Sequence, residues 1–220
     1  MKVVVFSAGR SGTNIALEVL RGNPYFLASD PPEDKAVFLR DMAYPDRYLT
    51  KSDATYCRSY SFLKNVMEQN RDMFIVWTVR DPRDMCLSKI RRGFKRGSDD
   101  ATFDGCIADL FHMVDLHKRA MNDFKDRIYT IKMENILLDT EPEIKNLCRW
   151  LNIEYLEEMK FFYKRMRNEN KRKRYSDIDL SQIKMYRNQI YTSEVADYGI
   201  NLVLLFLTIK PIINYFGYGV

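Results

Sequence analysis

The first twenty-two residues constrain the fold more than any other segment of the chain. Residues 2–8, KVVVFSA, form a continuous apolar run rich in β-branched side chains, typical of a strand buried in a parallel sheet. The glycine-rich turn GRSGTN (9–14) follows directly, and apolar residues then recur at helical spacing as far as Gly22. The segment therefore predicts a strand, a tight turn and a helix.

The same alternation of strands and helices continues along the chain. The runs MFIVWTV (73–79) and RIYTIKM (127–133) predict two further buried strands. After the first of these runs, Asp81 is suited to cap a helix and Pro82 to occupy its first turn. The stretch around Asp30, which contains two prolines, is expected to be a loop. Helical patterns occupy residues 62–70, 83–97, 103–124 and 141–153. We expect a three-layer α/β/α fold around a central parallel sheet.

Length and composition fit one globular domain spanning residues 1–220. The chain is 46% hydrophobic and 30% charged, and its net charge of +5 is too small to indicate a nucleic-acid partner. The apolar run 202–209 is less than half of a membrane span. We therefore expect residues 176–220 to form a helical segment packed on the domain, with a membrane-surface contact of the tail as the alternative. No charged leader followed by an apolar stretch begins the chain, which favours a cytoplasmic protein.

Neither the cysteines nor the histidines form a recognisable metal motif. Four scattered cysteines, at 57, 86, 106 and 148, are expected to be reduced and buried, and no metal site is expected. His112 and His117 lie five residues apart on the long predicted helix and are read as surface or core residues. The basic run 164–175 is either a solvated surface or a contact with an anionic ligand.

The turn after the first strand has the features of an anion site. Gly12 and Gly9 permit backbone angles closed to other residues, and the amides of the helix start can point at a phosphate. Ser11, Thr13 and Asn14 can add side-chain donors, and Arg10 adds a permanent positive charge. The turn lacks the lysine of the GxxxxGK[ST] nucleotide-binding loop.

A second set of polar residues is expected at the same edge of the sheet. Arg80 ends the second predicted strand, and Ser88 lies two turns into the helix that follows. A guanidinium and a hydroxyl there can hold a second phosphate. Two anion sites at one edge suggest a ligand with phosphates at both ends.

Together, GRSGTN and VRDPRDMCLS resemble the sulfotransferases that use 3′-phosphoadenosine 5′-phosphosulfate (PAPS). Arg10, Ser11, Gly12 and Thr13 match the family's 5′-phosphosulfate loop, in which Asn14 replaces the usual second threonine. Arg80 and Ser88 match the pair that holds the 3′-phosphate, with the eight-residue gap intact. The likeness covers roughly residues 1–155 and implies the P-loop NTPase-like sulfotransferase architecture. The segment MENI (133–136) departs from the family's YEDL, which puts an adenine contact by Met133 in doubt, and no clear C-terminal GxxG segment is found.

The resemblance implies transfer of a sulfuryl group from PAPS to a hydroxyl or amine, with release of adenosine 3′,5′-bisphosphate (PAP). Arg10 matches the catalytic cation, and no metal is required. Asp30 falls on or beside the family's carboxylate base, with Glu33 and Asp53 as alternatives. Lys51 matches a lysine near the sulfuryl group.

Three further points concern the alternatives to this reaction, its acceptor and the 3′-phosphate site. A P-loop-like small-molecule kinase and a non-catalytic nucleotide-binding module of the same fold are alternatives to the sulfotransferase. The acceptor, whether a small molecule, a glycan or a lipid-linked compound, would be selected by variable loops, which we expect at residues 25–62 and 93–105 and in the C-terminal segment. The residues around Lys171–Arg174 are expected to help hold the 3′-phosphate.

Overall fold

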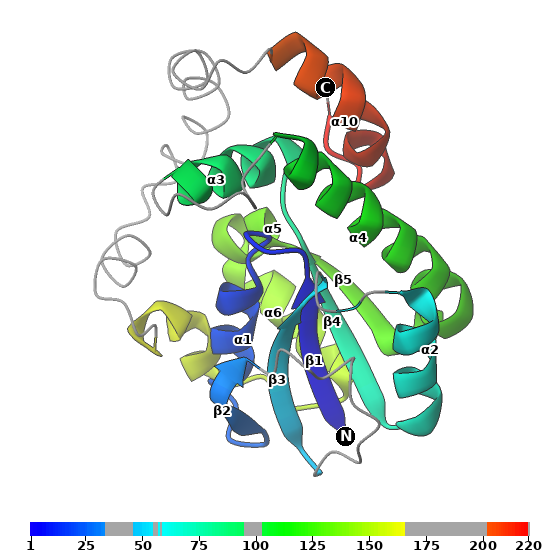
Figure 1. Ribbon diagram of the computed structural model, residues 1–220. Coiled ribbons are helices and arrows are strands. Elements are labelled where there is room, and N and C mark those ends of the chain that lie inside the picture. Colours follow the sequence, from blue (N-terminus) through cyan, green and yellow to red (C-terminus); the bar gives the residue numbers. More distant parts are fainter. Residues whose placement is uncertain (34–45, 55–56, 58, 95–102, 166–201, 220) are drawn as a thin grey trace.

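The fold is a parallel sheet of five strands between two layers of helices, in a computed structural model of the chain (Figure 1). The structure describes residues 1–33, 46–54, 57, 59–94, 103–165 and 202–219, with the backbone alone at 30–33, 90–94, 103 and 202–203. The strand order is β2-β3-β1-β4-β5, and all neighbouring strands are parallel. The strands are β1 (Lys2–Ser7), β2 (Leu27–Glu33), β3 (Tyr48–Asp53), β4 (Met73–Val79) and β5 (Ile128–Lys132).

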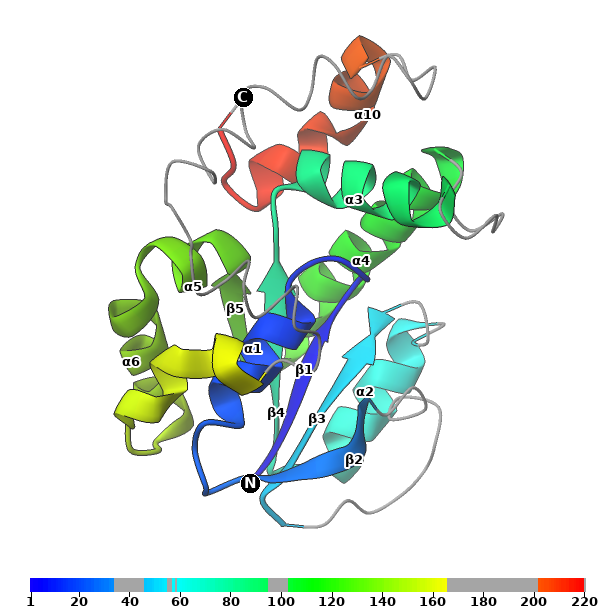
Figure 2. The same ribbon diagram turned by 90° about the vertical axis from the view of Figure 1, so that its left-hand side faces the viewer.

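Helices cover both faces of the sheet and its carboxyl edge (Figure 2). The α-helices are α1 (Thr13–Leu20), α2 (Tyr60–Gln69), α3 (Pro82–Phe94), α4 (Phe103–Phe124), α5 (Met133–Leu138), α6 (Thr140–Leu151) and α10 (Leu202–Tyr215). Two 3₁₀ segments, η3 (Lys125–Arg127) and η4 (Glu157–Arg165), complete the described helices. Figure 2 shows α3 and α10 lying across the end of the sheet toward which the strands point.

Side chains alternate between the two faces of the central strands and form two separate cores. Val3 and Val5 of β1 pack with α1, α6 and η4, whereas Val4 and Phe6 pack with α2, α4 and α10. The Phe6 ring meets Trp77 of β4 edge to face at 4.8 Å. Both faces of β1 are therefore buried, which explains its unbroken apolar sequence.

The predicted three-layer α/β/α class is confirmed, and the three buried strands lie where their apolar runs predicted them. The long helix at 103–124 also has its predicted limits. Treating residues 25–62 as variable loops was wrong in part, because β2 and β3 lie within them. Pro31 and Pro32 are tolerated because β2 is an edge strand, and its outer side forms no hydrogen bonds with another of the described strands. Its pairing with β3 is also irregular beyond Ala28.

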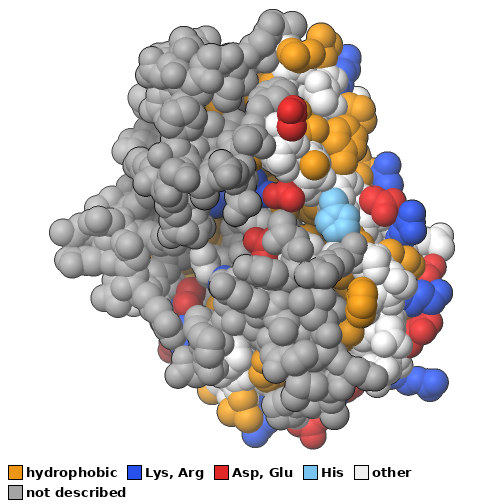
Figure 3. Space-filling view, viewed as in Figure 1, with side chains coloured by type: hydrophobic (Ala, Val, Ile, Leu, Met, Phe, Trp, Pro, Cys, Tyr) orange, Lys and Arg blue, Asp and Glu red, His pale blue; other side chains and the backbone are white. Residues whose placement is uncertain are grey.

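The C-terminal helix α10 packs against α3 and α4, whereas residues 176–201 of the predicted helical segment lie outside the described residues. Leu205, Ile209 and Ile213 are buried against α3 and α4, although Pro211 lies inside the helix. Leu204 and Leu207 are more than half exposed, and Figure 3 shows hydrophobic side chains gathered over α10. Across the described residues, no helix is both long and apolar enough to span a bilayer.

A buried histidine joins α10 to the core. His117 of α4 is hydrogen-bonded through Nδ1 to the Tyr215 hydroxyl at 2.8 Å and through Nε2 to the Thr130 hydroxyl at 2.7 Å. Its ring also meets Trp77 edge to face, with the centroids 4.9 Å apart. Burial lowers the pKa of His117 from 6.5 to about 4, because the charged imidazolium loses its hydration there.

This histidine makes the stability of the fold sensitive to acid. Because the pKa is lower in the folded chain, the unfolded chain takes up the proton first as the pH falls. The contribution is complete above about pH 6.5 and is lost on the way to about pH 4, which amounts to roughly 3 kcal/mol of unfolding free energy. Urea unfolding of His117→Gln should show a pH dependence weaker by that amount, whereas Phe111→Leu on the same helix, which changes no titratable group, keeps the wild-type drop. Parallel curves for His117→Gln and wild type would contradict this role.

Candidate active site

The turn between β1 and α1 has an unusual backbone. Arg10 has φ 76° and Gly12 has φ 98°, so two residues of this short turn adopt left-handed angles. Such angles cost a non-glycine residue about 1–3 kcal/mol, and they occur most often at functional sites. A Cβ at Gly12 would lie 2.7 Å from Cγ of Met133, so the turn is also tightly packed. Only glycine fits both the angle and the space at position 12.

The polar residues of the turn face different directions. Ser11 is fully buried, and its hydroxyl shares a 2.9 Å hydrogen bond with the hydroxyl of Thr78 in β4. Thr13 and the exposed Asn14 begin α1, where first-turn amides have no intrahelical acceptor. Ser11 therefore ties the turn to the sheet, while the start of α1 presents backbone and side-chain donors to a ligand.

The two segments singled out in the sequence meet directly. Arg10 Nε donates a 2.8 Å hydrogen bond to the hydroxyl of Ser88, although the two residues lie 78 positions apart. Ser88 sits on α3, which begins immediately after β4, and β4 pairs with β1. The parallel pairing of the two strands brings the turn and α3 to the same edge of the sheet.

Arg80 lies at this edge, between the end of β4 and the start of α3. Its side chain is only 15% exposed, and its nearest ion-pair partner is Asp84, at 3.8 Å from the guanidinium. The buried Nε of Arg80 has no hydrogen-bond partner among the described residues. A buried N–H without a partner is costly, so this guanidinium suits an anionic ligand that would accept from it.

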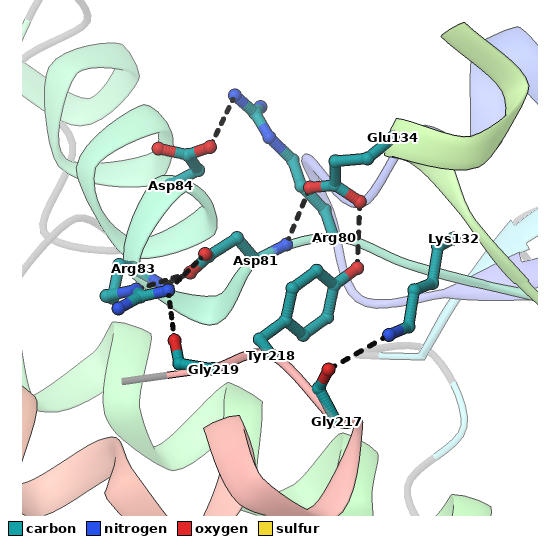
Figure 4. Close-up of polar contacts among 9 residues, drawn as sticks. All are labelled: Arg80, Asp81, Arg83, Asp84, Lys132, Glu134, Gly217, Tyr218 and Gly219. Atoms are coloured by element: carbon teal, nitrogen blue, oxygen red, sulfur yellow. Dashed lines mark hydrogen bonds and ion pairs between the residues drawn. The ribbon is translucent and has the colours of Figure 1, made fainter. Parts of the chain in front are cut away.

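The second arginine of the RDPR segment has a different environment. Asp81 Oδ1 accepts from the backbone N–H of Arg83 at 3.0 Å, which confirms Asp81 as the cap of α3. The same carboxylate holds the Arg83 guanidinium through two hydrogen bonds of 2.9 Å and 2.6 Å. Figure 4 shows this pair and the carboxylate of Glu134, which accepts from the Asp81 N–H at 2.9 Å. Arg83 is therefore a structural residue, in contrast to Arg80.

Charged residues of β3 and the helices surround the same turn. Lys51 and Asp53 alternate with the buried Ser52, so they share one face of β3. A Cβ at Gly9 would lie 2.8 Å from Oδ2 of Asp53 and 4.0 Å from Cε of Lys89, which places both side chains against the turn. The Lys89 ammonium is held in a short ion pair by Asp109 of α4.

The remaining candidates are not brought to the turn by the described structure. Asp30 and Glu33 lie on β2, separated from β1 by β3, and their side chains are outside the described residues. Lys171–Arg174 also lie outside them. His112 donates to the Cys57 carbonyl at 2.9 Å and His117 is buried, as the sequence suggested for both.

The cysteines are free and buried, as predicted. Burial raises the pKa of the Cys57 and Cys86 thiols to about 12, so neither is a reactive thiolate near neutral pH. Within the described part of the chain, no cluster of His, Cys, Asp or Glu is arranged to hold a metal ion.

Sequence reasoning missed several residues of the site. Thr78, Lys89 and Glu134 contribute contacts at the sheet edge; Thr78 and Lys89 lie outside the matched motifs, and Glu134 lies in MENI, which was noted only as a departure from YEDL. The only signal for them was position, since Thr78 and Glu134 each lie within two residues of the end of a buried strand.

Comparison with solved structures finds the same fold among sulfotransferases. The sulfotransferase domain from the curacin biosynthetic pathway has a TM-score of 0.61 and 13% identity, over 74% of this chain and 77% of that one. A Mycobacterium avium sulfotransferase has a TM-score of 0.62 and 10% identity, over 97% and 76%. A mouse sulfotransferase in complex with PAP has a TM-score of 0.51 and 18% identity, over 71% and 60%. At these identities the likeness is one of fold.

No curated protein sequence matches the chain significantly, whereas a family profile agrees with the structural comparison. The profile of the Sulfotransferase family matches residues 33–158, more than half of the chain, a span that includes Arg80 and Ser88 but not the turn with Arg10. With this match and the shared fold, the chain belongs to the sulfotransferase family.

Proposed function

We propose that the chain transfers the sulfuryl group of PAPS to a hydroxyl or amine acceptor and releases PAP. One observation carries the proposal: the hydrogen bond from Arg10 to Ser88 joins the two segments that resemble the donor-binding motifs of the family. A ligand with a phosphate at each end suits two cationic groups, Arg10 and Arg80, at one edge of a sheet.

The residues at this edge fit the donor. The positive end of α1, the amides of Thr13 and Asn14 and the guanidinium of Arg10 would hold the 5′-phosphosulfate. Arg80 would hold the 3′-phosphate through its buried Nε, and Ser88 lies where it can contact the same ligand. Gly12 would keep the backbone close to the phosphate.

The donor would supply an activated sulfuryl group, so the protein has to stabilise charge and move one proton. As the bond from sulfur to the 5′-phosphate oxygen breaks and the bond to the acceptor oxygen or nitrogen forms, negative charge collects on the phosphate. Arg10 would stabilise that charge most in the transition state, which is the condition for a faster reaction. Lys51, on the face of β3 that it shares with Asp53, would support the sulfuryl oxygens.

Asp53 is the carboxylate best placed to take the proton of the acceptor. Its Oδ2 lies against Gly9 of the glycine-rich turn (9–14). Strand β3 pairs directly with β1, and Ser7 and Asp53 are register partners in that pairing. Asp30 and Glu33 lie one strand farther away. Nε2 of His112 and both ring nitrogens of His117 make hydrogen bonds away from the turn. We therefore favour Asp53 over Asp30 as the general base.

The alternatives lack comparable support. A kinase acting with ATP needs a lysine directly after the last glycine of the turn, and this chain has Thr13 after Gly12. A non-catalytic module would not need the carboxylate of Asp53 against the turn that carries Arg10. We further propose a cytoplasmic protein whose acceptor is a small molecule, a glycan or a lipid-linked compound, with the exposed leucines of α10 as a contact for a membrane surface.

Replacing Arg10 tests the reaction directly. Transfer of radiolabelled sulfuryl from PAPS, measured with an acceptor found by screening phenols, sugars and lipid alcohols, should fall about 10²–10³-fold in kcat for Arg10→Ala. Arg119→Ala, which removes an exposed arginine on α4, is the matched control and should keep full activity.

Ligand-induced shifts of the melting temperature separate the three functions. We expect PAP to stabilise the wild-type chain and ATP with Mg²⁺ to leave it unchanged. Stabilisation by ATP with Mg²⁺ alone would favour a kinase, and PAP binding without any transfer would favour the module. Full activity of Arg10→Ala would contradict the assigned role of this residue.

A pair of carboxylate variants tests the choice of base. Asp53→Asn should lower kcat about 10²–10⁴-fold and remove the fall in rate at low pH, since the amide cannot take a proton. Asp30→Asn should keep both the rate and the pH profile of the wild type. PAP binding, measured by calorimetry, should persist in both variants. A larger loss in Asp30→Asn would reverse the assignment.

A further inference from the structure

Glu134 is a buried carboxylate for which the proposed reaction has no chemical role. It is 5% exposed and lies at the second position of α5, just beyond the end of β5. Its Oε1 accepts from the Asp81 N–H at 2.9 Å, and its Oε2 accepts from the Tyr218 hydroxyl at 2.8 Å. Both oxygens are thus engaged, one by the segment after β4 and one by the C-terminal segment (Figure 4).

The bond to Asp81 acts on the backbone that carries Arg80. The N–H that Glu134 holds belongs to the peptide between Arg80 and Asp81. On the far side of that peptide, Asp81 is fixed as the cap of α3 and as the partner of Arg83. Figure 4 shows the Arg80 side chain leaving this peptide toward Asp84, away from Tyr218. Glu134 therefore fixes the peptide from which Arg80 projects.

The C-terminal segment 217–219 is held at the same edge by three further contacts. Lys132 Nζ donates to the Gly217 carbonyl at 3.2 Å, and Arg83 donates to the Gly219 carbonyl at 3.1 Å. The Lys132 ammonium also lies over the Tyr218 ring, 4.5 Å from its centroid. Gly217 has φ 66°, a left-handed angle that turns the chain after α10 back toward the sheet. These contacts place the Tyr218 hydroxyl within hydrogen-bond distance of Glu134.

We propose that Tyr218 and Glu134 are positioning residues for the 3′-phosphate site, acting through the backbone of Arg80. The Tyr218 hydroxyl holds Glu134 on the Arg80–Asp81 peptide, and this peptide aims the Arg80 guanidinium at the ligand. Removing the hydroxyl leaves a buried carboxylate oxygen without its donor, so Glu134 reorients and its hold on the peptide weakens. The inference rests on the proposed function, because it assumes that Arg80 binds the 3′-phosphate of PAP.

The test compares two ligands that differ only in that phosphate. Calorimetry should give a lower Kd for PAP than for adenosine 5′-phosphate with the wild-type chain. Tyr218→Phe should weaken PAP binding about three- to tenfold, the range for loss of one ordinary hydrogen bond, because its effect on Arg80 is indirect, and should leave adenosine 5′-phosphate unchanged. Tyr215→Phe is the matched control: it removes another tyrosine hydrogen bond of the same C-terminal region, to the buried His117, and should keep the full preference for PAP.

Variants of Glu134 show whether the two residues act as one unit. Glu134→Ala should lose as much preference for PAP as Tyr218→Phe or more, and the double variant should lose no more than Glu134→Ala alone. Glu134→Gln retains one acceptor oxygen for the Asp81 N–H and an amide that can donate to Tyr218, so its loss should be smaller. If Glu134→Ala fails to fold, Tyr218→Phe and Glu134→Gln carry the test.

The outcomes separate this inference from the proposed function. An equal loss for both ligands in Tyr218→Phe, or no loss for either, would overturn the positioning role while leaving the donor site intact. A wild-type chain that binds PAP no more tightly than adenosine 5′-phosphate would instead overturn the 3′-phosphate site, and the positioning role with it.

Discussion

The parallel direction of the strands is the constraint on which the site depends. Because β1 pairs with β3 on one side and with β4 on the other, all three strands end at one edge of the sheet. The glycine-rich turn (9–14) follows β1, Asp53 ends β3, Arg80 follows β4 and Glu134 follows β5. Arg10, Asp53, Arg80 and Glu134 each lie within three residues of a strand end, whereas Ser88 lies on α3. The sheet therefore positions most of these residues, and α3 adds Ser88.

The sequence predicted the centre of this sheet well and its margin poorly. Strands β1 and β4 are buried on both faces, so each reads as an unbroken apolar run, and the glycine-rich turn marks where the first of them ends. Strand β3 begins with Tyr48 and Leu49 and continues with four polar residues, and β2 contains Pro31 and Pro32, so neither resembles a buried strand. Both lie toward the margin of the sheet, where one face or one side of the ladder is less constrained, and apolar patterning carries less information there.

Within the site, the sequence likewise predicts residues that lie in short motifs better than contacts between segments that are far apart along the chain. Arg10 and Ser88 could be singled out because each lies in a short motif with a fixed spacing. The contact of Met133 with Gly12 could not, because it joins the end of β5 to the first turn. In the sequence, the segment MENI appeared only as a departure from a family pattern. In the structure its first residue, Met133, packs on the glycine-rich turn, and its second, Glu134, accepts a hydrogen bond from the N–H of the peptide between Arg80 and Asp81. A pairing such as Glu134 with Tyr218, 84 positions apart, depends on tertiary packing alone.

Arg80 and Arg83 illustrate how two identical side chains, three positions apart, take different roles. Asp81 neutralises Arg83 with two hydrogen bonds, and the Gly219 carbonyl accepts a third. Arg80 has Asp84 at 3.8 Å and a buried Nε without a partner among the described residues, an arrangement that costs about 1–3 kcal/mol. Proteins keep such local costs where a ligand offsets them, and an anion is the ligand that a guanidinium selects. The energetic contrast between the two arginines, more than the motif that contains them, supports the proposal that Arg80 binds the 3′-phosphate.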